Sequence, residues 1–367
     1  MFIKRFFVVQ VALFVLLGQG MVFAKGESVS VKGLEVRAFH FVLRNVAPDR
    51  AKWMIDVAAN SGFNTVQVIL TDGVRLDNAP WKPMPDAWSK QVFVNWVKYA
   101  RSKGVEVIPE LKLLTHQEKF MQSNHPQLMF NSLTYDPRNE KVYQIVFALL
   151  DEVIELVQPK AIHIGHDEVS GRLFRNKLGM LRPAHLKRGE SALPPNLFLQ
   201  DVLKIHNYLK SKNIETWMWG DMLLSPSEFP NMKEAPLHGT LSGYGPELRK
   251  KLPRDLVICD WHYYETTPDF PSLTVLKNEG FRVLAAVWKD ENTTRNFSRY
   301  AVSNNAYGAI ATTWFHVQKR DWSDVEWILQ TAGTLFRNPN AVLTGSKRSE
   351  LRSSSDGGLQ SLDNGLD

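Results

Sequence analysis

Two adjacent carboxylates, Asp167 and Glu168, are the residues of this chain whose types and spacing best suit chemistry. They end the stretch Ala-Ile-His-Ile-Gly-His-Asp-Glu, which begins as a short apolar run at residues 161–165. Carboxyl groups this close do not both ionise in a partly dry cleft as easily as they do in water. A site of this kind holds a proton donor and an anion together at neutral pH. The pair therefore predicts acid–base chemistry if the fold places it in a cleft.

Composition restricts the kinds of protein and site that the chain can represent. It has 367 residues, of which 44% are hydrophobic, enough for one large globular domain or two ordinary ones. The net charge of +6 is too small and too dispersed to indicate a nucleic-acid partner. Because Cys259 is the single cysteine, no internal disulfide is possible. The sequence has no Gly-x-Gly-x-x-Gly turn, no Gly-x-Ser-x-Gly elbow and no metal-ligand spacing, so it predicts neither metal nor cofactor.

The two ends differ in composition from the rest of the chain. Residues 1–24 have the pattern of a secretory signal peptide, with a positive start, an apolar run and a small-residue cleavage site. We therefore expect an exported protein, periplasmic or secreted, with no stable membrane insertion after cleavage; an uncleaved N-terminal membrane anchor is the alternative. Residues 345–367 are rich in Ser, Gly and Asp, which predicts a disordered tail. Residues 25–344 remain as one catalytic domain.

Short apolar segments alternate with amphipathic ones along this domain. The apolar segments predict eight strands, at residues 35–42, 65–70, 105–110, 161–165, 215–219, 256–261, 282–287 and 309–314. Apolar residues spaced three and four apart predict helices between them, at 49–60, 88–103, 140–157 and 197–212. Alternating strands and helices form parallel sheets, because a parallel pair needs a long crossover. Eight such units predict an α/β fold, a closed (β/α)8 TIM barrel, with a doubly wound open sheet as the alternative.

The residues at the strand ends are the next place to look, because barrel enzymes carry their active sites at the C-terminal ends of the strands. These positions hold Arg44, Asp72, Arg75, Glu110, His116, Asp167, Glu168, Trp219, Asp221, Trp261, Tyr263, Tyr264, Trp288, Trp314 and His316. Flat aromatic faces suit the apolar face of a sugar ring, and carboxylates suit its hydroxyls and its glycosidic oxygen. Core packing is the alternative for any one Trp. Together, the set indicates a carbohydrate site.

At this point the chain resembles glycoside hydrolase family 20, the β-N-acetylhexosaminidases, and specifically a short single-barrel branch. The family's strand-four hallmark, His-x-Gly-Gly-Asp-Glu, is similar to residues 163–168, His-Ile-Gly-His-Asp-Glu. The strand-three motif Pro-Glu-Ile-Asp-x-Pro-Gly-His is similar to residues 109–116, Pro-Glu-Leu-Lys-Leu-Leu-Thr-His. Residues 64–72 and 217–222 resemble two further family motifs, and all four occur in the family's order.

The resemblance implies a substrate-assisted mechanism, in which the 2-acetamido oxygen of an amino sugar attacks its own anomeric carbon. It implies that Glu168 is the general acid and then the base, and that Asp167 holds the acetamido N–H. An ionised Asp167 would also disfavour loss of the proton from Glu168. His116 or His163 would orient Glu168, and Arg37 or Arg44 would bind sugar hydroxyls. The implied substrate pocket contains Trp219, Asp221, Trp261, Trp288 and Trp314, with Tyr263 or Tyr264 on the acetamido oxygen.

The sequence departs from the family pattern at several positions. His166 replaces a Gly, Lys112 replaces an acid, and Leu114 and Thr115 replace Pro-Gly. We expect a bulky imidazole next to the acid pair to change substrate fit or to shift the pKa of Glu168. We expect an exo-acting β-N-acetylhexosaminidase with an amino-sugar glycan as substrate. The alternatives are a carbohydrate-binding pseudoenzyme and a barrel glycosidase for a different glycan. The sugar epimer, the linkage and the oligomeric state remain open.

Overall fold

The computed structural model describes residues 33–118, 120–169, 173–175, 181–183, 186–232, 241–265, 267–314 and 322–343. The chain divides into two units, Met1–Val31 and Lys32–Asp367, and all of these residues belong to the second. The predicted signal peptide and the predicted tail at 345–367 lie outside the described residues. Within the described ranges, no helix combines the length and the apolarity needed to cross a bilayer.

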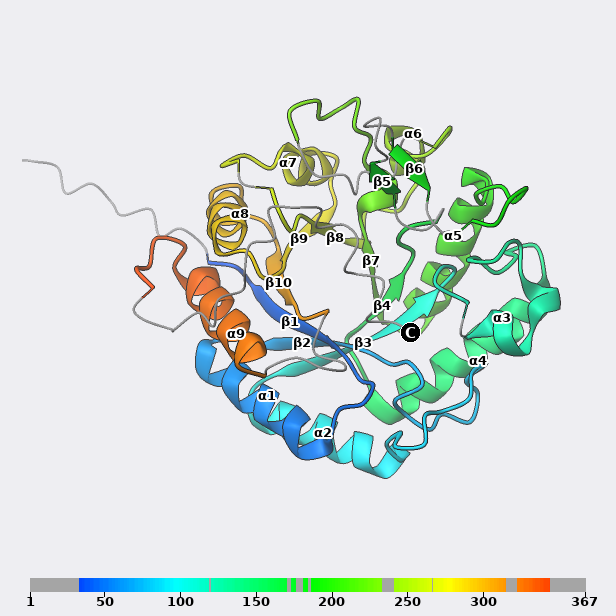
Figure 1. Ribbon diagram of the computed structural model, residues 1–367, viewed down its shortest axis with the longest axis horizontal. Helices are drawn as coiled ribbons and strands as arrows, with labels where there is room; N and C mark the ends of the chain where they lie inside the picture. The colour runs from blue at the N-terminus through cyan, green and yellow to red at the C-terminus, as the bar shows by residue number, and fades with distance from the viewer. Residues whose placement is uncertain are drawn as a thin grey trace, which may run out of the picture. The chain divides into compact units, whose positions relative to one another are not determined.

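Eight parallel strands form a closed barrel, which confirms the predicted (β/α)8 fold (Figure 1). Around the barrel the order is β1, β10, β9, β8, β7, β4, β3, β2. The strands are β1 (Val36–Val42), β2 (Thr65–Ile69), β3 (Glu106–Leu113), β4 (Ala161–Gly165), β7 (Glu215–Trp219), β8 (Val257–Trp261), β9 (Arg282–Val287) and β10 (Gly308–Thr312). Each overlaps a predicted strand. β3 differs most, because it continues three residues beyond its predicted end at residue 110.

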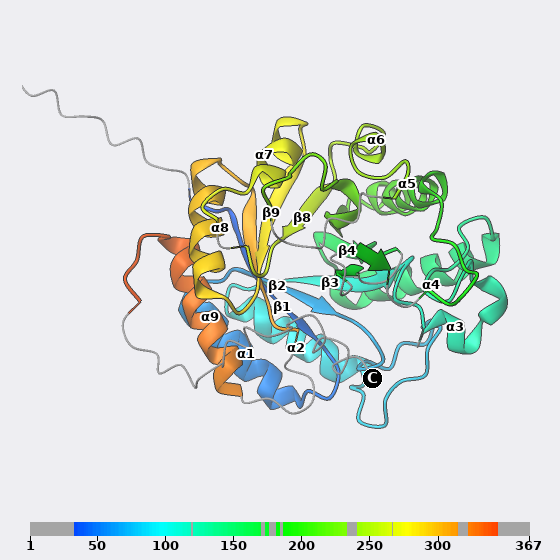
Figure 2. The ribbon, with the colours of Figure 1, turned by 45° about the horizontal axis from the view of Figure 1, so that its top comes forward.

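Helices connect successive strands and surround the barrel (Figure 2). The longer ones are α1 (Pro48–Ser61), α2 (Lys90–Ser102), α4 (Glu140–Val157), α5 (Pro195–Ser211), α7 (Pro271–Asn278), α8 (Glu291–Ser303) and α9 (Trp322–Arg337). The shorter elements are α3 (Met121–Asn124), α6 (Pro246–Arg249), η1 (Pro126–Leu128) and η2 (Asp221–Leu223), with an antiparallel pair, β5 (Leu173–Arg175) and β6 (Leu181–Pro183). The predicted helices correspond to α1, α2, α4 and α5, and no range was predicted for α7, α8 or α9. The antiparallel pair and the short helices were not predicted either, because three- and four-residue elements carry too little periodicity.

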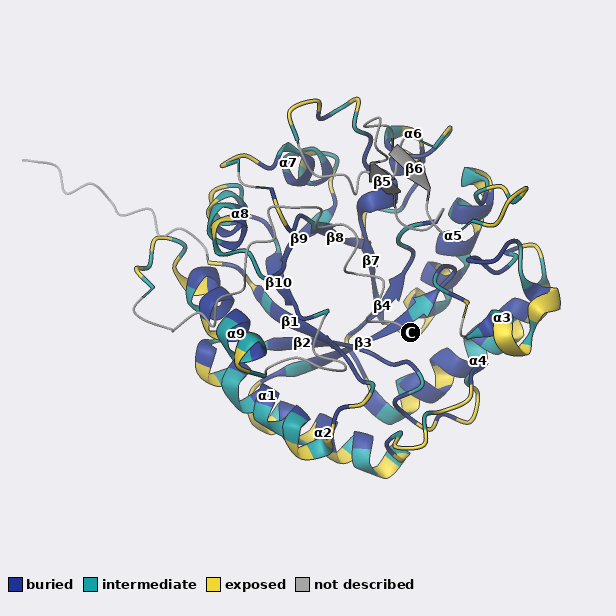
Figure 3. Ribbon diagram, viewed as in Figure 1, coloured by how far each residue is buried: buried dark blue, intermediate teal, exposed yellow. Residues whose placement is uncertain are grey.

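Alternation along each strand divides the core into two layers. In β1, Phe39 and Phe41 point outward, and their rings meet Phe63 and Trp96 in the layer between strands and helices. Ala38, directly before Phe39 and on the opposite face of the strand, belongs to a separate cluster inside the barrel. The strands are accordingly buried along their length, whereas the outer faces of the helices are exposed (Figure 3). Side chains therefore fill the barrel, and a substrate can reach only its ends.

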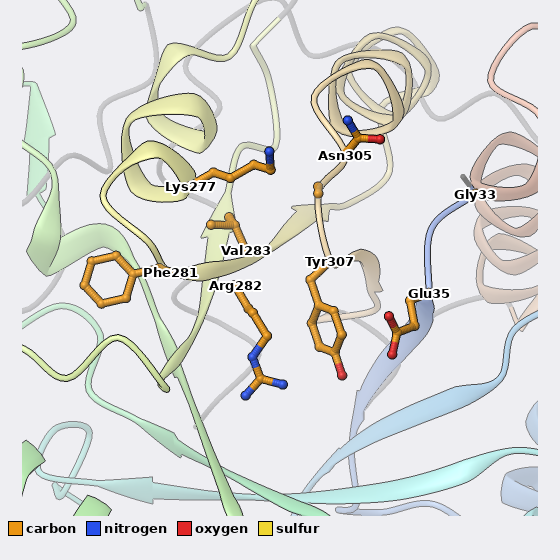
Figure 4. Close-up of a pocket in the computed structure, with 9 residues that line it drawn as sticks. Gly33, Glu35, Lys277, Phe281, Arg282, Val283, Asn305 and Tyr307 are labelled. Carbon is orange, nitrogen blue, oxygen red and sulfur yellow. The ribbon is translucent and has the colours of Figure 1, made fainter. Parts of the chain in front are cut away.

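The two ends of the barrel carry different features. A cavity of about 220 Å³ lies at the N-terminal ends of β1, β9 and β10, where it is lined by Glu35, Arg282 and Tyr307 among others (Figure 4). Arg282 is engaged there, since its guanidinium donates to Glu215 at 2.7 Å and lies 5.0 Å from the centre of the Tyr307 ring. The acid pair Asp167–Glu168 follows the C-terminal end of β4. The cavity and the acid pair are thus at opposite ends of the barrel.

Candidate active site

Two tight turns, one after β3 and one after β4, carry the titratable groups of the site. Leu114 and His116 in the first turn have φ angles of 66° and 57°. Three residues of the second turn have positive φ angles: 75° at Gly165, 68° at His166 and 50° at Glu168. Non-glycine residues seldom adopt this left-handed region, and backbone held there tends to occur at functional sites. Both turns therefore depend on the surrounding structure to hold them.

The first turn is closed by the side chain of Gln117. Its amide nitrogen donates to the carbonyl oxygens of Lys112 and Thr115, the latter at 2.7 Å. Its backbone N–H donates to the carbonyl of Leu133 at 3.1 Å, which ties the turn to the following loop. These bonds fix the position of His116, the residue directly before Gln117.

His116, Asp167 and Glu168 come together where the two turns meet. His116 Nε2 lies 3.1 Å from Asp167 Oδ2 and 3.8 Å from Glu168 Oε2. The Thr115 hydroxyl donates to the other oxygen of Asp167 at 3.5 Å. All three titratable side chains keep a small exposed fraction, 19% for His116, 18% for Asp167 and 13% for Glu168. The acid pair is therefore neither free in solvent nor sealed in the core.

The pKa values of Asp167 and His116 depend on burial, on each other and on the nearby charge of Lys112. Burial acts to raise the pKa of Asp167, but the charge and hydrogen bond of His116, with the charge of Lys112, hold that pKa below its usual range. Burial acts to lower the pKa of His116, but the charge and hydrogen bond of Asp167 raise it overall. The two form a carboxylate–imidazolium pair beside Glu168. Lys112, which stands where the family has an acid, adds positive charge near this pair.

Asp221, at the start of η2, supports the acid turn from the other side. Its Oδ2 accepts the backbone N–H of Glu168 at 2.9 Å, and its Oδ1 accepts Trp261 Nε1 at 3.4 Å. Burial and the charge of Asp167 raise the pKa of Asp221 well above its ordinary value. The side chain is buried. Asp221 thus connects the acid turn to Trp261, and this contact to the turn was not anticipated from the sequence.

Aromatic side chains at the ends of β8, β9 and β10 form the facing wall. Trp261 and Tyr263 stack with ring centroids 5.0 Å apart, and Tyr263 meets Trp288 edge-on at 5.8 Å. Trp314 Nε1 donates to the Tyr263 hydroxyl at 2.9 Å. Trp261 and Trp314 are partly exposed, whereas Trp288 is buried and Tyr264 is 45% exposed. Trp261, Trp314 and Tyr264 therefore carry the exposed surface of this wall, whereas Tyr263 and Trp288 are buried behind it.

Below the site, a buried polar cluster fills the centre of the barrel. Glu110 accepts from Gln67 Nε2 at 2.6 Å and from Trp219 Nε1 at 3.2 Å. His40 and His163 lie 3.6 Å and 3.7 Å from its two oxygens. Burial raises the pKa of Glu110 to about 7. Sequence reasoning missed Gln67 and His40, although both are polar residues at inward positions of otherwise apolar strands, which is the signal that would have found them.

His163 and Trp219 belong to this cluster, so of the two histidines expected as alternatives for orienting Glu168, His163 contacts Glu110 instead. The His163 ring lies 4.6 Å from that of Trp219, and its Nδ1 accepts the Gly165 N–H at 3.1 Å. Burial lowers the pKa of His163 to about 3, so the ring is neutral. His163 points into the barrel because it lies two residues before the end of β4, on the inward side. His116 occupies the place beside the acids.

Two other predicted residues also need correction. Arg37 binds the carbonyl oxygens of Gly62 and Leu34, both at 2.8 Å, at the N-terminal end of β1, so it is not a substrate ligand. His166 was expected to alter substrate fit. Instead, its fully buried ring turns away from the acids towards α5, where Nε2 lies 2.8 Å from Asp201 Oδ2. Arg44 does lie at the C-terminal end of β1, where its Nε is 3.3 Å from Asp72 Oδ1.

The ligating atoms of His116, Asp167 and Glu168 lie within 4.8 Å of one another, a spacing that a divalent cation would accept. The hydrogen bond between His116 and Asp167 already accounts for the short distance between two of them. The spacing by itself therefore does not define a metal site.

A carboxylate pair and an aromatic wall at the C-terminal ends of a closed parallel barrel define a (β/α)8-barrel glycoside hydrolase. The sequence model described as glycosyl hydrolase family 20, catalytic domain, matches residues 53–314, and the chain belongs to this family. The match spans β2 to β10 and includes both turns of the site.

Individual relatives are distant. The chain is 29% identical over 138 residues to a lacto-N-biosidase of Bifidobacterium bifidum, covering 35% of this chain and 12% of that protein. It is 28% identical over 147 residues to beta-hexosaminidase A of Caenorhabditis elegans, covering 34% of this chain and 25% of that protein. Among solved structures, the chitobiase of Flavobacterium johnsoniae superposes with a TM-score of 0.59 at 14% identity, over 82% of this chain and 48% of that one. The matches thus span a quarter or less of these two curated relatives.

Proposed function

We propose that this protein is an exo-acting β-N-acetylhexosaminidase that works by a retaining, substrate-assisted mechanism. The observation that carries the proposal is the cluster of His116, Asp167 and Glu168, with His116 3.1 Å from one acid and 3.8 Å from the other. Membership of family 20 and the aromatic wall opposite the cluster support the same reading.

In this mechanism Glu168 donates its proton to the glycosidic oxygen as the bond from that oxygen to the anomeric carbon breaks. The acetamido oxygen of the same sugar forms a bond to that carbon from the opposite face, which gives an oxazolinium ion. Asp167, kept ionised by His116, accepts the acetamido N–H and stabilises the positive charge. Glu168 then takes a proton from water as the water attacks the carbon. The two inversions give net retention.

The wall supplies recognition of the sugar. Trp261 and Trp314 offer partly exposed indoles for the apolar face of the ring and for the acetamido methyl group. Between the two tyrosine candidates, Tyr263 is the better one for the acetamido oxygen. Its hydroxyl lies 2.9 Å from Trp314 Nε1 within the wall, whereas the Tyr264 side chain is 45% exposed.

The test is a panel of chromogenic glycosides, with Glu168→Gln compared with the wild type. The variant should release aglycone from aryl N-acetyl-β-glucosaminide or galactosaminide about 10²- to 10⁴-fold more slowly, the usual loss for a general acid. Glu155→Gln, on the exposed face of α4, is the matched control and should keep the wild-type rate. A wild-type rate in Glu168→Gln contradicts the assignment.

A thiazoline analogue of the oxazoline separates the proposal from its alternatives. Tight competitive inhibition is expected, because the analogue matches an intermediate formed by the acetamido group. Hydrolysis of an unacetylated glycoside without thiazoline inhibition would indicate a barrel glycosidase for a different glycan. Calorimetric binding of N-acetylglucosamine without turnover of any substrate in the panel would indicate a carbohydrate-binding pseudoenzyme.

We also propose that the protein is exported, on the signal-like pattern of residues 1–24. Expression in a bacterial host, followed by N-terminal sequencing of the periplasmic fraction, tests this. A mature chain that begins near Lys25 supports cleavage. An intact N-terminus in the membrane fraction would support an uncleaved anchor instead.

A further inference from the structure

His166 is the clearest departure from the family's strand-four motif, and the structure gives it a partner that the sequence did not indicate. Its Nε2 lies 2.8 Å from Asp201 Oδ2 on α5, and its Nδ1 lies 2.9 Å from the carbonyl oxygen of Ile164. Both side chains, His166 and Asp201, are fully buried. The ring also packs edge-on against Phe198, with centroids 5.5 Å apart.

Hydrogen-bond partners occupy both sides of the His166 ring and both oxygens of Asp201. A carbonyl oxygen only accepts, so the Nδ1 of His166 must carry a proton. Asp201 accepts from the hydroxyl of Tyr143 at 2.8 Å and from that of Tyr135 at 3.0 Å. The carboxyl group of Asp201 therefore has three hydrogen-bond partners: the two hydroxyls and Nε2 of His166. His166 and Asp201 are a hydrogen-bonded pair inside the protein, with both nitrogens of the ring engaged.

The same pair reaches the other turn of the site through Tyr135. While its hydroxyl donates to Asp201, the backbone N–H of Tyr135 donates to the carbonyl oxygen of Leu114 at 3.2 Å. Leu114 lies two residues before His116, in the turn after β3. His166 directly precedes Asp167 in the turn after β4. One continuous chain of bonds thus joins the backbone on either side of the contact between His116 and Asp167.

The backbone explains why such support is needed. His166 has a φ of 68°, where glycine is favoured and where any other residue is strained. Histidine is among the residues that tolerate this region better than most, but the strain persists only when the surroundings hold it. The two hydrogen bonds of the buried ring, to Ile164 and to Asp201, provide that hold.

We propose that the buried hydrogen-bonded pair of His166 and Asp201, extended by Tyr135, positions the two turns so that His116 meets Asp167 and Glu168. The role rests on the proposed function, because its purpose is to align the acid pair. His166 is thus a positioning residue that takes the place of glycine, rather than a residue that contacts substrate.

His166→Asn is the main test. Asparagine also tolerates a positive φ, but it lacks the two ring nitrogens that contact Ile164 and Asp201. We expect kcat to fall about 10- to 100-fold with KM within about 2-fold of the wild type, as for a misplacement of catalytic groups. We also expect the pKa of His116, followed by NMR, to fall towards that of a free histidine as Asp167 moves away. The His116 signal is identified by its absence in His116→Asn.

The matched control is His206→Asn. His206 is also a buried histidine, on α5, with Nδ1 3.0 Å from the Thr216 hydroxyl and Nε2 3.1 Å from Asp255 at the other end of the barrel. It should lose stability but keep the wild-type kcat and the wild-type His116 titration. Equal changes in the two variants would overturn the proposal, as would a wild-type kcat and titration in His166→Asn.

A second pair of variants covers the case in which His166→Asn does not fold. Tyr135→Phe and Tyr143→Phe each remove one hydroxyl from Asp201, but of the two tyrosines it is Tyr135 whose backbone N–H bonds to the turn that carries His116. Tyr135→Phe should therefore shift the His116 titration more than Tyr143→Phe, and the opposite order or no difference overturns the proposal. Because the titration needs no substrate, it decides the matter even if the wild type hydrolyses no N-acetylhexosaminide.

Discussion

His116 Nε2 lies 3.1 Å from Asp167 Oδ2, although the two residues are 51 positions apart in the chain. They meet because β3 and β4 are neighbours in the barrel, with Leu113 paired to Gly165 at the last point of their register. Each residue stands a few positions beyond that pair, in a turn with positive φ angles. The contact favours the charged form of both groups and leaves Glu168 beside an ion pair.

Asp167→Asn should lower kcat and change the pH dependence of stability. The pKa of Asp167 is below 3.8 and that of His116 is above 6.5 in the folded protein. A lowered acid pKa gives stability that is lost as pH falls through it, and a raised histidine pKa gives stability that is lost as pH rises through it. The difference in unfolding free energy between wild type and variant should therefore be largest between about pH 4 and 6.5. Chemical denaturation at a series of pH values measures it, and a flat difference contradicts the ion pair.

Glu110→Gln should remove a pH dependence of stability that the wild type has. Burial raises the pKa of Glu110 from 4.5 to about 7, so its contribution is greatest below pH 4.5 and is lost as pH rises to about 7. The loss is on the order of 3 kcal/mol across that range, since each pKa unit corresponds to about 1.4 kcal/mol. Urea titrations at pH 5 and pH 7.5 measure the free energy of unfolding. Between these two pH values it should decrease less for Glu110→Gln than for the wild type. An equal decrease would place the titrating group elsewhere.

Tyr263→Phe and Tyr264→Phe should differ both in stability and in KM. Removing the Tyr263 hydroxyl takes the acceptor from Trp314 Nε1, which costs about 0.5–1.5 kcal/mol for a hydrogen bond of a partly exposed side chain. KM should rise as well, because the same hydroxyl is the candidate ligand of the acetamido oxygen. Tyr264 is 45% exposed, so its substitution should change neither value by more than a small amount. Thermal unfolding and steady-state kinetics of both variants give the comparison, and similar values for the two would contradict the assignment.

Arg37→Ala should destabilise the protein without affecting the site. Its guanidinium joins the carbonyl oxygens of Leu34 and Gly62 at the N-terminal end of β1. We expect a loss of about 1–3 kcal/mol, as for bonds from a charged donor, with KM unchanged. Differential scanning calorimetry and kinetics on an N-acetylhexosaminide check both statements. A raised KM with unchanged stability would return Arg37 to the substrate site.

Much of the fold and part of the site were predictable from the sequence. The eight strands follow from apolar runs between amphipathic segments, and closure into a barrel follows from their number. Asp167 and Glu168 were predicted from their position at the end of one such run. The end of β3 was not, because residues 111–113 are part of a strand only through their contact with β4. No local pattern contains that contact.

The sequence by itself determined the order of the strands and helices, the acid pair and the aromatic residues available to line a site, because periodicity and residue type are local properties. Only the tertiary structure decided which residues face which. Among the histidines, it placed His116 against the acids, His163 in the barrel core and His166 on α5 with Asp201. It also placed Arg37 at the wrong end of β1 for a substrate ligand. The physical reason is that a side chain's direction at a strand end depends on one or two backbone dihedrals, and the hydrogen-bond partners that fix those dihedrals are distant in the chain.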